Sequence, residues 1–385
     1  MKSAIPYGRQ EITEEDIHAV CEVLRSDFLT QGPKIEEFEQ KFAQYIGSKY
    51  AVAVSNGTAA LHLCALAMGV KSGSKVITTP ITFAASANCV KYCDGEVLFA
   101  DIDPKTAIID LNQVEDIFKK NTTKSIQGVI PVDFAGYAVD LEDLRSITDK
   151  YGAWIVEDAC HAPGGFFLDK NRTQQNCGNG NFAEMAIFSF HPVKHIATGE
   201  GGMITTNDKL LYDKLLLLRS HGITRNAKLL SETHGAWYYE MQELGYNYRL
   251  SDINAALGIS QLSRAVTNLE KRKQLAKRYD LAFVNSEIRP LYKDNWNGNA
   301  YHLYIVRTNK RDELYNYLKS KMIFCQIHYI PVHTFPYYQN LGYKKGILTH
   351  SEKYYSECLT LPLYPSLLIQ EQDFVIETIF NFINQ

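Results

Sequence analysis

The sequence lacks the segments that would place the protein in a membrane or on nucleic acid. No apolar run approaches the roughly 20 residues needed to cross a bilayer, and residues 1–10 contain no apolar stretch typical of an export signal. No run of lysine and arginine stands out, and 40 basic residues stand against 43 acidic ones, for a net charge of -3. We therefore expect a cytoplasmic protein that binds neither membranes nor nucleic acid phosphates.

Patterns for metal binding and for structural disulfides are also missing. The eight cysteines are scattered, and the closest pair, Cys89 and Cys93, lacks the spacing of a zinc site or of a redox motif. Free thiols in a reducing compartment and no metal site are the expectation. The chain has neither internal repeats nor a low-complexity linker.

The length and composition are those of a globular protein with more than one core. The chain has 385 residues, of which 45% are hydrophobic and 22% charged. A chain of this length is too long for one ordinary core and suits two or three packed units.

The first two thirds of the chain alternate short apolar runs with helical patterns. A helix starts at a capping box formed by Thr13 and Asp16, and a second runs from Ile35 to Ile46 and ends at Gly47. Strands are then predicted at Tyr50–Val54, Lys75–Thr79, Glu96–Ala100, Gly128–Val132, Ala153–Val156, Met185–Phe188 and Gly202–Thr205. This alternation predicts an α/β fold with a mostly parallel sheet covered on both faces.

The pattern changes near Ser251, where a long helix begins. A smaller α/β unit follows from about residue 285, with strands near Tyr301–Val306 and Phe324–His328. We therefore predict two domains: a large α/β domain over residues 1–250, and a C-terminal part over residues 251–385 that comprises the long helix and a smaller α/β domain.

An anion site is predicted where the strand Tyr50–Val54 meets the next helix. The turn Ser55-Asn-Gly-Thr58 leaves backbone N–H groups at the positive end of the helix dipole. Gly57 lets a ligand approach closely, and Thr58 adds a hydroxyl group. The alternative is that glycine serves only the sterics of this turn.

Two charged residues follow later strands. Asp158 ends an apolar strand, where ligands of open α/β sheets bind, although a helix N-cap is an equal alternative. Lys194 comes just after a strand, among apolar residues and close to glycines, where a loss of hydration would lower its pKa and favour a free amine. A solvated surface lysine is its ordinary alternative. The order of glycine turn, aspartate and lysine is typical of pyridoxal-phosphate enzymes, in which they hold the phosphate, the ring nitrogen and the aldehyde carbon.

Several segments resemble the DegT type of sugar aminotransferase, in family order and over almost the whole chain. They are Thr30-Gln-Gly-Pro33, Ser55-Asn-Gly-Thr-Ala-Ala-Leu61, Glu157-Asp-Ala-Cys-His161, Phe188-Ser-Phe-His-Pro-Val-Lys194, Gly245-Tyr-Asn-Tyr-Arg-Leu250 and His328-Tyr-Ile-Pro-Val-His333. The resemblance implies a fold type I pyridoxal-phosphate-dependent transferase with pyridoxal 5'-phosphate as its cofactor. It also implies a homodimer whose two active sites each draw on both subunits.

The resemblance assigns roles to residues of this chain. Lys194 would form the Schiff base and then move the proton, Asp158 would hold the pyridine nitrogen, and Phe83 would stack on the ring. Gly57, Thr58 and Ser189 would bind the cofactor phosphate, and Asn247 would reach that phosphate from the partner subunit. His161 stands near the ring hydroxyl, where many relatives carry glutamine, and histidine can titrate. Phe83 and Ser189 also have plain alternatives as a core residue and a backbone cap.

Further segments resemble the enzyme of the pseudaminic acid pathway that aminates a UDP-linked 4-keto sugar. They are Thr79-Pro-Ile-Thr-Phe83, Pro131-Val-Asp-Phe-Ala-Gly136, Arg219-Ser-His-Gly-Ile223, Trp237-Tyr-Tyr239 and Gln326-Ile-His-Tyr-Ile-Pro-Val-His333. L-glutamate is the amino donor that the resemblance implies, with Arg249 as a candidate partner of its carboxylate. Candidates for contact with the nucleotide-sugar are Tyr7, Asp27, Phe28, Leu29, Thr30, Gln326, Ile327, His328 and Tyr329.

Three alternatives remain open at this point. The chain could be another nucleotide-sugar 4-aminotransferase, of the perosamine or aminoarabinose type. It could belong to the relatives that remove a sugar hydroxyl, but these carry histidine where this chain has Lys194. It could also be a non-catalytic regulatory relative, which would predict lost site residues and a basic DNA-binding face, and the sequence shows neither.

Overall fold

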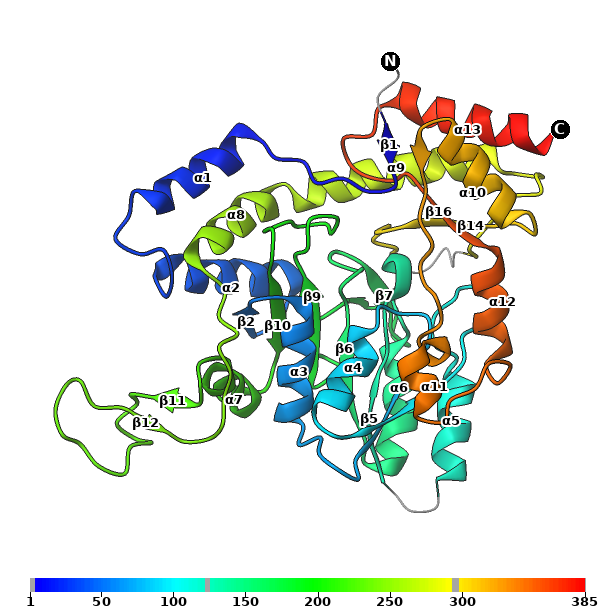
Figure 1. Ribbon diagram of the computed structural model, residues 1–385. Coiled ribbons are helices and arrows are strands. Elements are labelled where there is room, and N and C mark those ends of the chain that lie inside the picture. Colours follow the sequence, from blue (N-terminus) through cyan, green and yellow to red (C-terminus); the bar gives the residue numbers. More distant parts are fainter. Residues whose placement is uncertain (1–3, 122–124, 293–297, 385) are drawn as a thin grey trace.

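A seven-stranded sheet forms the centre of the protein, with strand order β2-β10-β9-β6-β5-β3-β4 (Figure 1). The computed structural model describes residues 4–121, 125–292 and 298–384. The strands are β2 (Tyr50–Val54), β3 (Lys75–Thr78), β4 (Glu96–Phe99), β5 (Ile126–Ile130), β6 (Trp154–Asp158), β9 (Met185–Ser189) and β10 (Gly202–Thr206). Only β10 runs opposite to the other six strands, so the carboxyl ends of those six meet at one edge.

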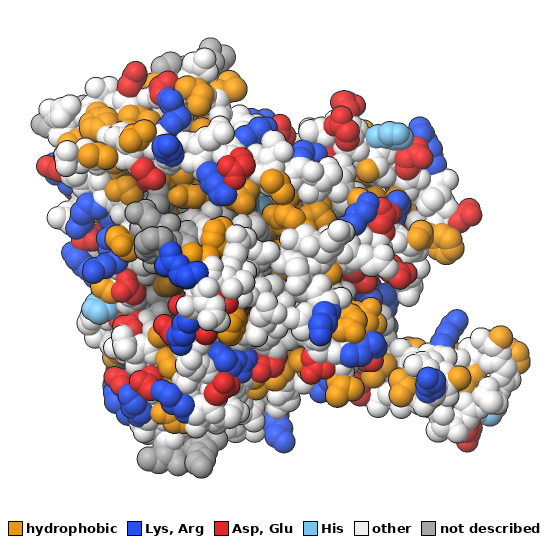
Figure 2. All heavy atoms as spheres, turned by 180° about the vertical axis from the view of Figure 1, so that it is seen from behind, with side chains coloured by type: hydrophobic (Ala, Val, Ile, Leu, Met, Phe, Trp, Pro, Cys, Tyr) orange, Lys and Arg blue, Asp and Glu red, His pale blue; other side chains and the backbone are white. Residues whose placement is uncertain are grey.

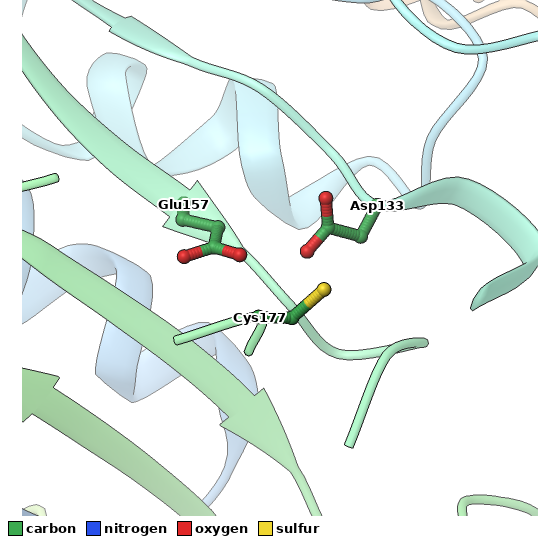
Figure 3. A group of neighbouring side chains, drawn as sticks. All are labelled: Asp133, Glu157 and Cys177. Atoms are coloured by element: carbon green, nitrogen blue, oxygen red, sulfur yellow. The ribbon is translucent and has the colours of Figure 1, made fainter. Parts of the chain in front are cut away.

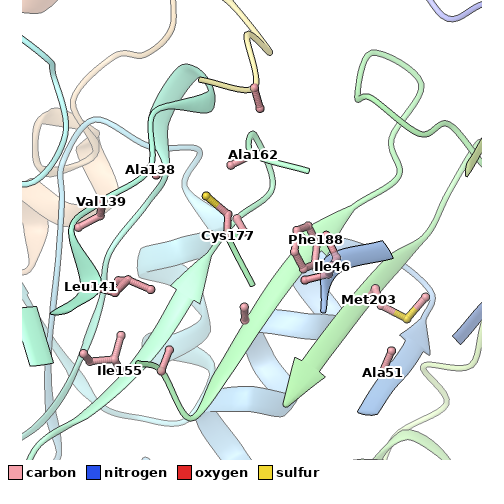
Figure 4. Packing of buried hydrophobic residues seen from close by; sticks show 14 of the residues in the cluster. Ile46, Ala51, Ala138, Val139, Leu141, Ile155, Ala162, Cys177, Phe188 and Met203 are labelled. Carbon is pink, nitrogen blue, oxygen red and sulfur yellow. The ribbon is translucent and has the colours of Figure 1, made fainter. Parts of the chain in front are cut away.

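Helices cover both faces of this sheet, as its doubly buried strands require. The helices α2 (Pro33–Ile46), α5 (Leu111–Lys120) and α6 (Leu141–Thr148) share one core with residues such as Phe42 and Phe188. Figure 4 shows part of that packing, including Ile46, Leu141 and Met203. On the opposite face lie α3 (Gly57–Ala67), α4 (Ala85–Tyr92) and α7 (Lys209–Arg219). The α/β architecture and the seven predicted strands are confirmed, with small differences at the strand ends.

A second core lies in the C-terminal third. It is built on the antiparallel strands β13 (Arg289–Pro290), β14 (Tyr304–Arg307) and β16 (Cys358–Leu361), with the helices α9 (Ala265–Ala282), α10 (Arg311–Ser320) and α13 (Ile369–Ile383). The helices α11 (Pro336–Asn340) and α12 (Thr349–Glu357) lead into β16. The expected strand near Phe324–His328 was too long, because β15 covers only Ile323–Phe324. Beyond it the chain touches β16 through one isolated bridge, Gln326 to Thr360.

The start of the chain packs against this C-terminal third. The strand β1 (Ile5–Pro6) pairs with β15, and α1 (Glu14–Leu24) lies along α8 (Asp252–Ser263), so the start of the chain lies beside the C-terminal third in Figure 1. Buried Asp16 accepts hydrogen bonds from Thr13 N at 3.0 Å and from Arg264 Nη2 at 2.6 Å. The first of these bonds belongs to the capping box that the sequence predicts. The division into domains at residue 250 stays a prediction.

Two hairpins extend the large sheet region. The short hairpin of β7 (Phe166–Leu168) and β8 (Gln174–Asn176) lies near β6, and β11 (Ile223–Thr224) pairs with β12 (Glu240–Met241). The second hairpin forms an arm that stands away from the body, and Figure 2 shows it as a separate lobe. On the face in Figure 2, Lys and Arg side chains are interspersed with Asp and Glu. Within the described residues no helix is long and apolar enough to cross a membrane.

Candidate active site

A cavity of about 670 Å³ opens beside the carboxyl ends of β2, β6 and β9. The residues that the sequence analysis singled out and that line this cavity are Tyr7, Gly57, Thr58, Phe83, Asp158, His161, Ser189, Lys194, His328 and Tyr329. These residues lie together because the residues that follow parallel strands all emerge at the same edge of the sheet. Lining residues to which the sequence analysis gave no individual role include Asn56, Thr82, Ser86, Glu200, Tyr248 and His302.

The turn from β2 into α3 forms one end of the cavity. Asn56 caps the helix, since its Oδ1 accepts a hydrogen bond from Ala59 N at 2.8 Å. The backbone N–H groups of Gly57 and Thr58 lie in the first turn of α3, where a helix offers no internal acceptor. A Cβ on Gly57 would lie 3.1 Å from the Cβ of Ser189, so glycine allows Ser189 of β9 to approach closely. Backbone N–H groups and two hydroxyls thus converge, and they suit a phosphate group.

Asp158 forms the floor of the cavity at the end of β6. Its side chain is 4% exposed and accepts hydrogen bonds from Ser86 Oγ at 2.6 Å and from Cys160 N at 3.2 Å. Ser86 is itself within 2.8 Å of Thr82 Oγ1. All of these donors are neutral, so they orient the carboxylate without cancelling its charge. Ser86 lies on α4, far from Asp158 in sequence, which is why no local pattern pointed to it.

Lys194 lies in the loop that joins β9 to β10. Burial of its amine lowers the pKa of Lys194, and the nearby Cys160 thiol and Asp158 carboxylate only partly oppose that shift. The backbone of the loop is fixed, since Lys194 N donates to His191 O at 2.8 Å. A lowered pKa increases the share of neutral amine at physiological pH, and the neutral amine is the nucleophilic form.

Both nitrogens of the His161 ring have partners. Ala135 N donates to Nδ1 at 3.2 Å, and Nε2 lies 3.2 Å from the Tyr329 hydroxyl. A backbone N–H can only donate, so a neutral ring carries its proton on Nε2 and donates it to Tyr329. The Tyr329 hydroxyl then keeps its own proton for another acceptor. The titration that the sequence left open is suppressed, since burial first, and the charge of Lys194 second, hold the pKa of His161 well below its usual range.

Three more buried histidines surround Lys194 and His161. They are His195, His302 and His328, and burial is the main cause that lowers the pKa of each, to about 3 for His195 and His328. The positive charge of Lys194 acts in the same direction on all three pKa values. These rings are therefore neutral at physiological pH, and they offer hydrogen bonds without adding charge.

Several predicted residues lie outside this cavity. Asp27, Phe28, Leu29 and Thr30 are exposed on the segment after α1, and Gln326 is exposed beside the half-buried Ile327. The half-buried Arg249 pairs through its backbone with Val54, and the exposed Asn247 pairs through its backbone with Ser220. Phe83 does line the cavity, but 63% of it is exposed, which places it at the rim.

Replacing His161 tests this hydrogen-bond chain. Gln can accept from Ala135 N and donate to Tyr329, whereas Leu leaves the buried Ala135 N–H without a partner. We expect His161→Leu to lower the free energy of unfolding by ~1–3 kcal/mol at neutral pH, and His161→Gln to lower it by less than that. Denaturant titration of both variants measures this difference, and equal losses would show that the ring only fills space.

The pH dependence of the same variants provides a second readout. In the native state His161 resists protonation, whereas in the unfolded chain it binds a proton below about pH 6.5. Stability is therefore lost as the pH falls below that value. The Gln variant lacks this loss and should become relatively more stable than the wild type between about pH 6 and pH 5.

Comparisons with known proteins agree with this geometry. The chain is 37% identical over 97% of its length to the spore coat polysaccharide biosynthesis protein SpsC of Bacillus subtilis, of which it covers 96%. It is 35% identical over 99% of its length to a UDP-4-amino-4,6-dideoxy-N-acetyl-beta-L-altrosamine transaminase of Campylobacter jejuni, of which it covers 98%.

Solved structures give the same result. The PLP form of the putative sugar aminotransferase Spr1654 of Streptococcus pneumoniae matches 99% of each chain, with a TM-score of 0.89 and 29% identity. Helicobacter pylori PseC, an aminotransferase of pseudaminic acid biosynthesis, matches 99% of this chain and 100% of its own, with a TM-score of 0.89 and 28% identity. Residues 10–380 match the DegT/DnrJ/EryC1/StrS aminotransferase family. The chain belongs to this family and is a PLP-dependent sugar aminotransferase.

Proposed function

We propose that the protein transfers an amino group from L-glutamate to C4 of a UDP-linked 4-keto-6-deoxy-N-acetylhexosamine. The product is UDP-4-amino-4,6-dideoxy-N-acetyl-beta-L-altrosamine, a precursor of pseudaminic acid. The observation that carries the proposal is the cavity that holds Lys194, Asp158 and the phosphate-binding turn at Gly57 together. The 35% identity to the Campylobacter jejuni transaminase supports the choice of sugar.

Residues of this chain divide the chemistry between them. Bound pyridoxal phosphate supplies an electron sink and carries the amino group between the two substrates. Asp158 holds a proton on the ring nitrogen, because a buried carboxylate with only neutral donors favours a cation beside it. Lys194 takes a proton from the substrate carbon and returns it, which requires the neutral amine that burial favours. Gly57, Thr58 and Ser189 would hold the phosphate, and Phe83 would contact the ring.

Tyr7, His328 and Tyr329 form the proposed sugar end of the cavity. The rings of Tyr7 and His328 lie 5.2 Å apart, and His328 Nδ1 lies 2.8 Å from Thr360 Oγ1, which leaves Nε2 for a ligand. Tyr329 has a proton to donate, as its bond to His161 implies. Uncharged donors and acceptors of this kind suit sugar hydroxyls and an N-acetyl group. They also reject analogues that lack such groups.

The proposed active unit is a homodimer with shared sites. Asn247, Arg249, residues 27–30 and Gln326 lie outside the cavity of their own chain. We assign Asn247 to the phosphate of the partner's cofactor. Residues 27–30 and Gln326 are assigned to the nucleotide, and Arg249 to the carboxylate of glutamate.

The substrate is tested by direct competition among keto-sugars. At matched concentrations we expect the highest kcat/KM for the UDP-linked 2-acetamido-2,6-dideoxy-4-keto hexose of L-arabino configuration. A dTDP-4-keto-6-deoxyglucose lacks the N-acetyl arm and should be slower by at least about 100-fold, because the groups that bind this arm would lose their partner. Faster turnover of the dTDP-sugar would instead indicate another nucleotide-sugar 4-aminotransferase, such as the perosamine type.

The shared site is tested by mixing two inactive variants. Lys194→Ala and Asn247→Ala should each be inactive as homodimers. In a mixed dimer one site carries both lesions and the other carries neither, so activity should return to about half of the wild-type value per mixed dimer. Subunit exchange is followed with differently tagged chains. Exchange without recovered activity would rule out the sharing of sites.

A further inference from the structure

Three acidic side chains meet in the core behind the cavity. Asp133 follows β5, Glu157 precedes Asp158 on β6, and Cys177 follows β8, and all three are at most 2% exposed. One ligand atom of each lies within 4.8 Å of the others, and Figure 3 shows the three groups pointing toward one another. The proposed reaction does not use any of them.

The hydrogen bonds around these groups leave a gap. Val139 N donates to Asp133 Oδ1 at 2.9 Å, and Gly178 N donates to Glu157 Oε2 at 2.9 Å. Asp133 Oδ2 is buried and accepts no hydrogen bond from the described residues. No lysine or arginine among the described residues forms an ion pair with Asp133 or Glu157. Two adjacent carboxylates without a cation cannot both stay ionised in such a place.

We propose that Asp133 and Glu157 share one proton, with Glu157 as the neutral acid that donates to Asp133 Oδ2. The gap at Oδ2 is then filled, and Asp133 is the single ionised member of the group. It accepts from the Val139 N–H, from the Glu157 carboxyl and from the Cys177 thiol. Glu157 and Cys177 keep their protons and donate them to Asp133. The three acidic groups together therefore carry one negative charge.

The surroundings favour this distribution of protons. Burial raises the pKa of Asp133 to about 6, and burial together with Asp133 raises the pKa of Glu157 well above its usual range. The pKa of Cys177 is also raised well above its usual range, mainly by burial. The charge of Asp158 raises the pKa of both carboxyls, and Asp133 in turn raises the pKa of the Cys160 thiol. Near neutral pH, Glu157 and Cys177 thus hold their protons.

This pair positions the active site through the turn after β5. Asp133 N donates to Asp158 O at 3.1 Å, and Gly136 N donates to Asp133 O at 3.1 Å. The turn between them carries Ala135, whose φ of 60° is unusual for a residue with a side chain and whose N–H fixes the ring of His161. The Asp133 side chain closes this turn by accepting from Val139 N at 2.9 Å, so the pair acts as positioning residues for Asp158 and His161 and touches no ligand.

Two amide substitutions in the holoenzyme distinguish the partners. In Glu157→Gln an amide N–H replaces the acid proton and still donates to Asp133, so at least half of the wild-type kcat should remain. In Asp133→Asn the new N–H₂ group faces other donors, so the same measurement should show a loss of about tenfold or more. The reverse order of these two effects would place the proton on Asp133 and overturn the assignment.

The proton itself is measured through the pH dependence of unfolding. The raised pKa means that the native protein keeps a proton on Glu157 that the unfolded chain releases above about pH 4.3. The stability that this proton contributes is therefore lost as the pH rises, and Glu157→Gln removes that loss. The histidines titrate alike in the wild type and in Glu157→Gln, and above about pH 7 Asp133 is ionised in both, so the slopes of stability against pH should there differ by one proton.

Infrared spectroscopy and elemental analysis complete the test. The wild type should show a carbonyl band of a protonated carboxylic acid that shifts in heavy water, and Glu157→Gln should lack this band. An unchanged pH slope in Glu157→Gln, or a missing band in the wild type, would overturn the shared proton. A stoichiometric divalent cation in the purified holoenzyme that is lost in Glu157→Gln would also overturn it, in favour of a metal site.

Discussion

The buried negative charge of Asp158 is the constraint on which the active site depends. Its carboxylate is oriented by a hydroxyl and a backbone N–H, and neither neutralises it. A charge held in this way stabilises a cation in the adjoining cavity, and we propose that this cation is the protonated ring nitrogen of the cofactor. Ser86 of α4, which is hydrogen-bonded to Thr82, fixes the direction of the Asp158 carboxylate.

The surroundings keep this charge from being cancelled. Four buried histidines stay neutral, and Lys194 itself tends toward its neutral form. Behind Asp158, a second and third carboxylate would repel it, and the proton that we assign to Glu157 limits the extra charge to one. The site thus contains many hydrogen-bonding groups and few charged ones. Such a lining suits the binding of an uncharged sugar ring and the transfer of protons to and from it.

The parts that the sequence predicted are those with a strong local signal. The seven strands follow from apolar runs bounded by turn residues, and Gly47 does end α2 with a left-handed φ of 90°. The residues at strand ends, such as Asp158 and Lys194, could be placed in one cavity because parallel strands share an edge. The resemblance to the family supplied the roles of these residues, which composition and spacing alone left open.

The parts that the sequence did not predict depend on contacts between distant segments. Ser86 and Asp158 are 72 residues apart, and Tyr329 reaches His161 across 168 residues. The expected strand at Phe324–His328 was too long because pairing partners, and not β-propensity, decide how far a strand extends. The gathering of Asp133, Glu157 and Cys177 likewise comes from three separate elements, and Cys177 gave no signal beyond its residue type.

The central claim is that Lys194 is the lysine that carries the cofactor. Reduction of the holoenzyme with borohydride, followed by proteolysis and mass spectrometry, attaches the cofactor permanently to the lysine that held it. We expect the added mass on the peptide that contains Lys194, and on no other peptide. Labelling of another lysine, or unlabelled Lys194 in a sample that holds stoichiometric cofactor, would contradict the account.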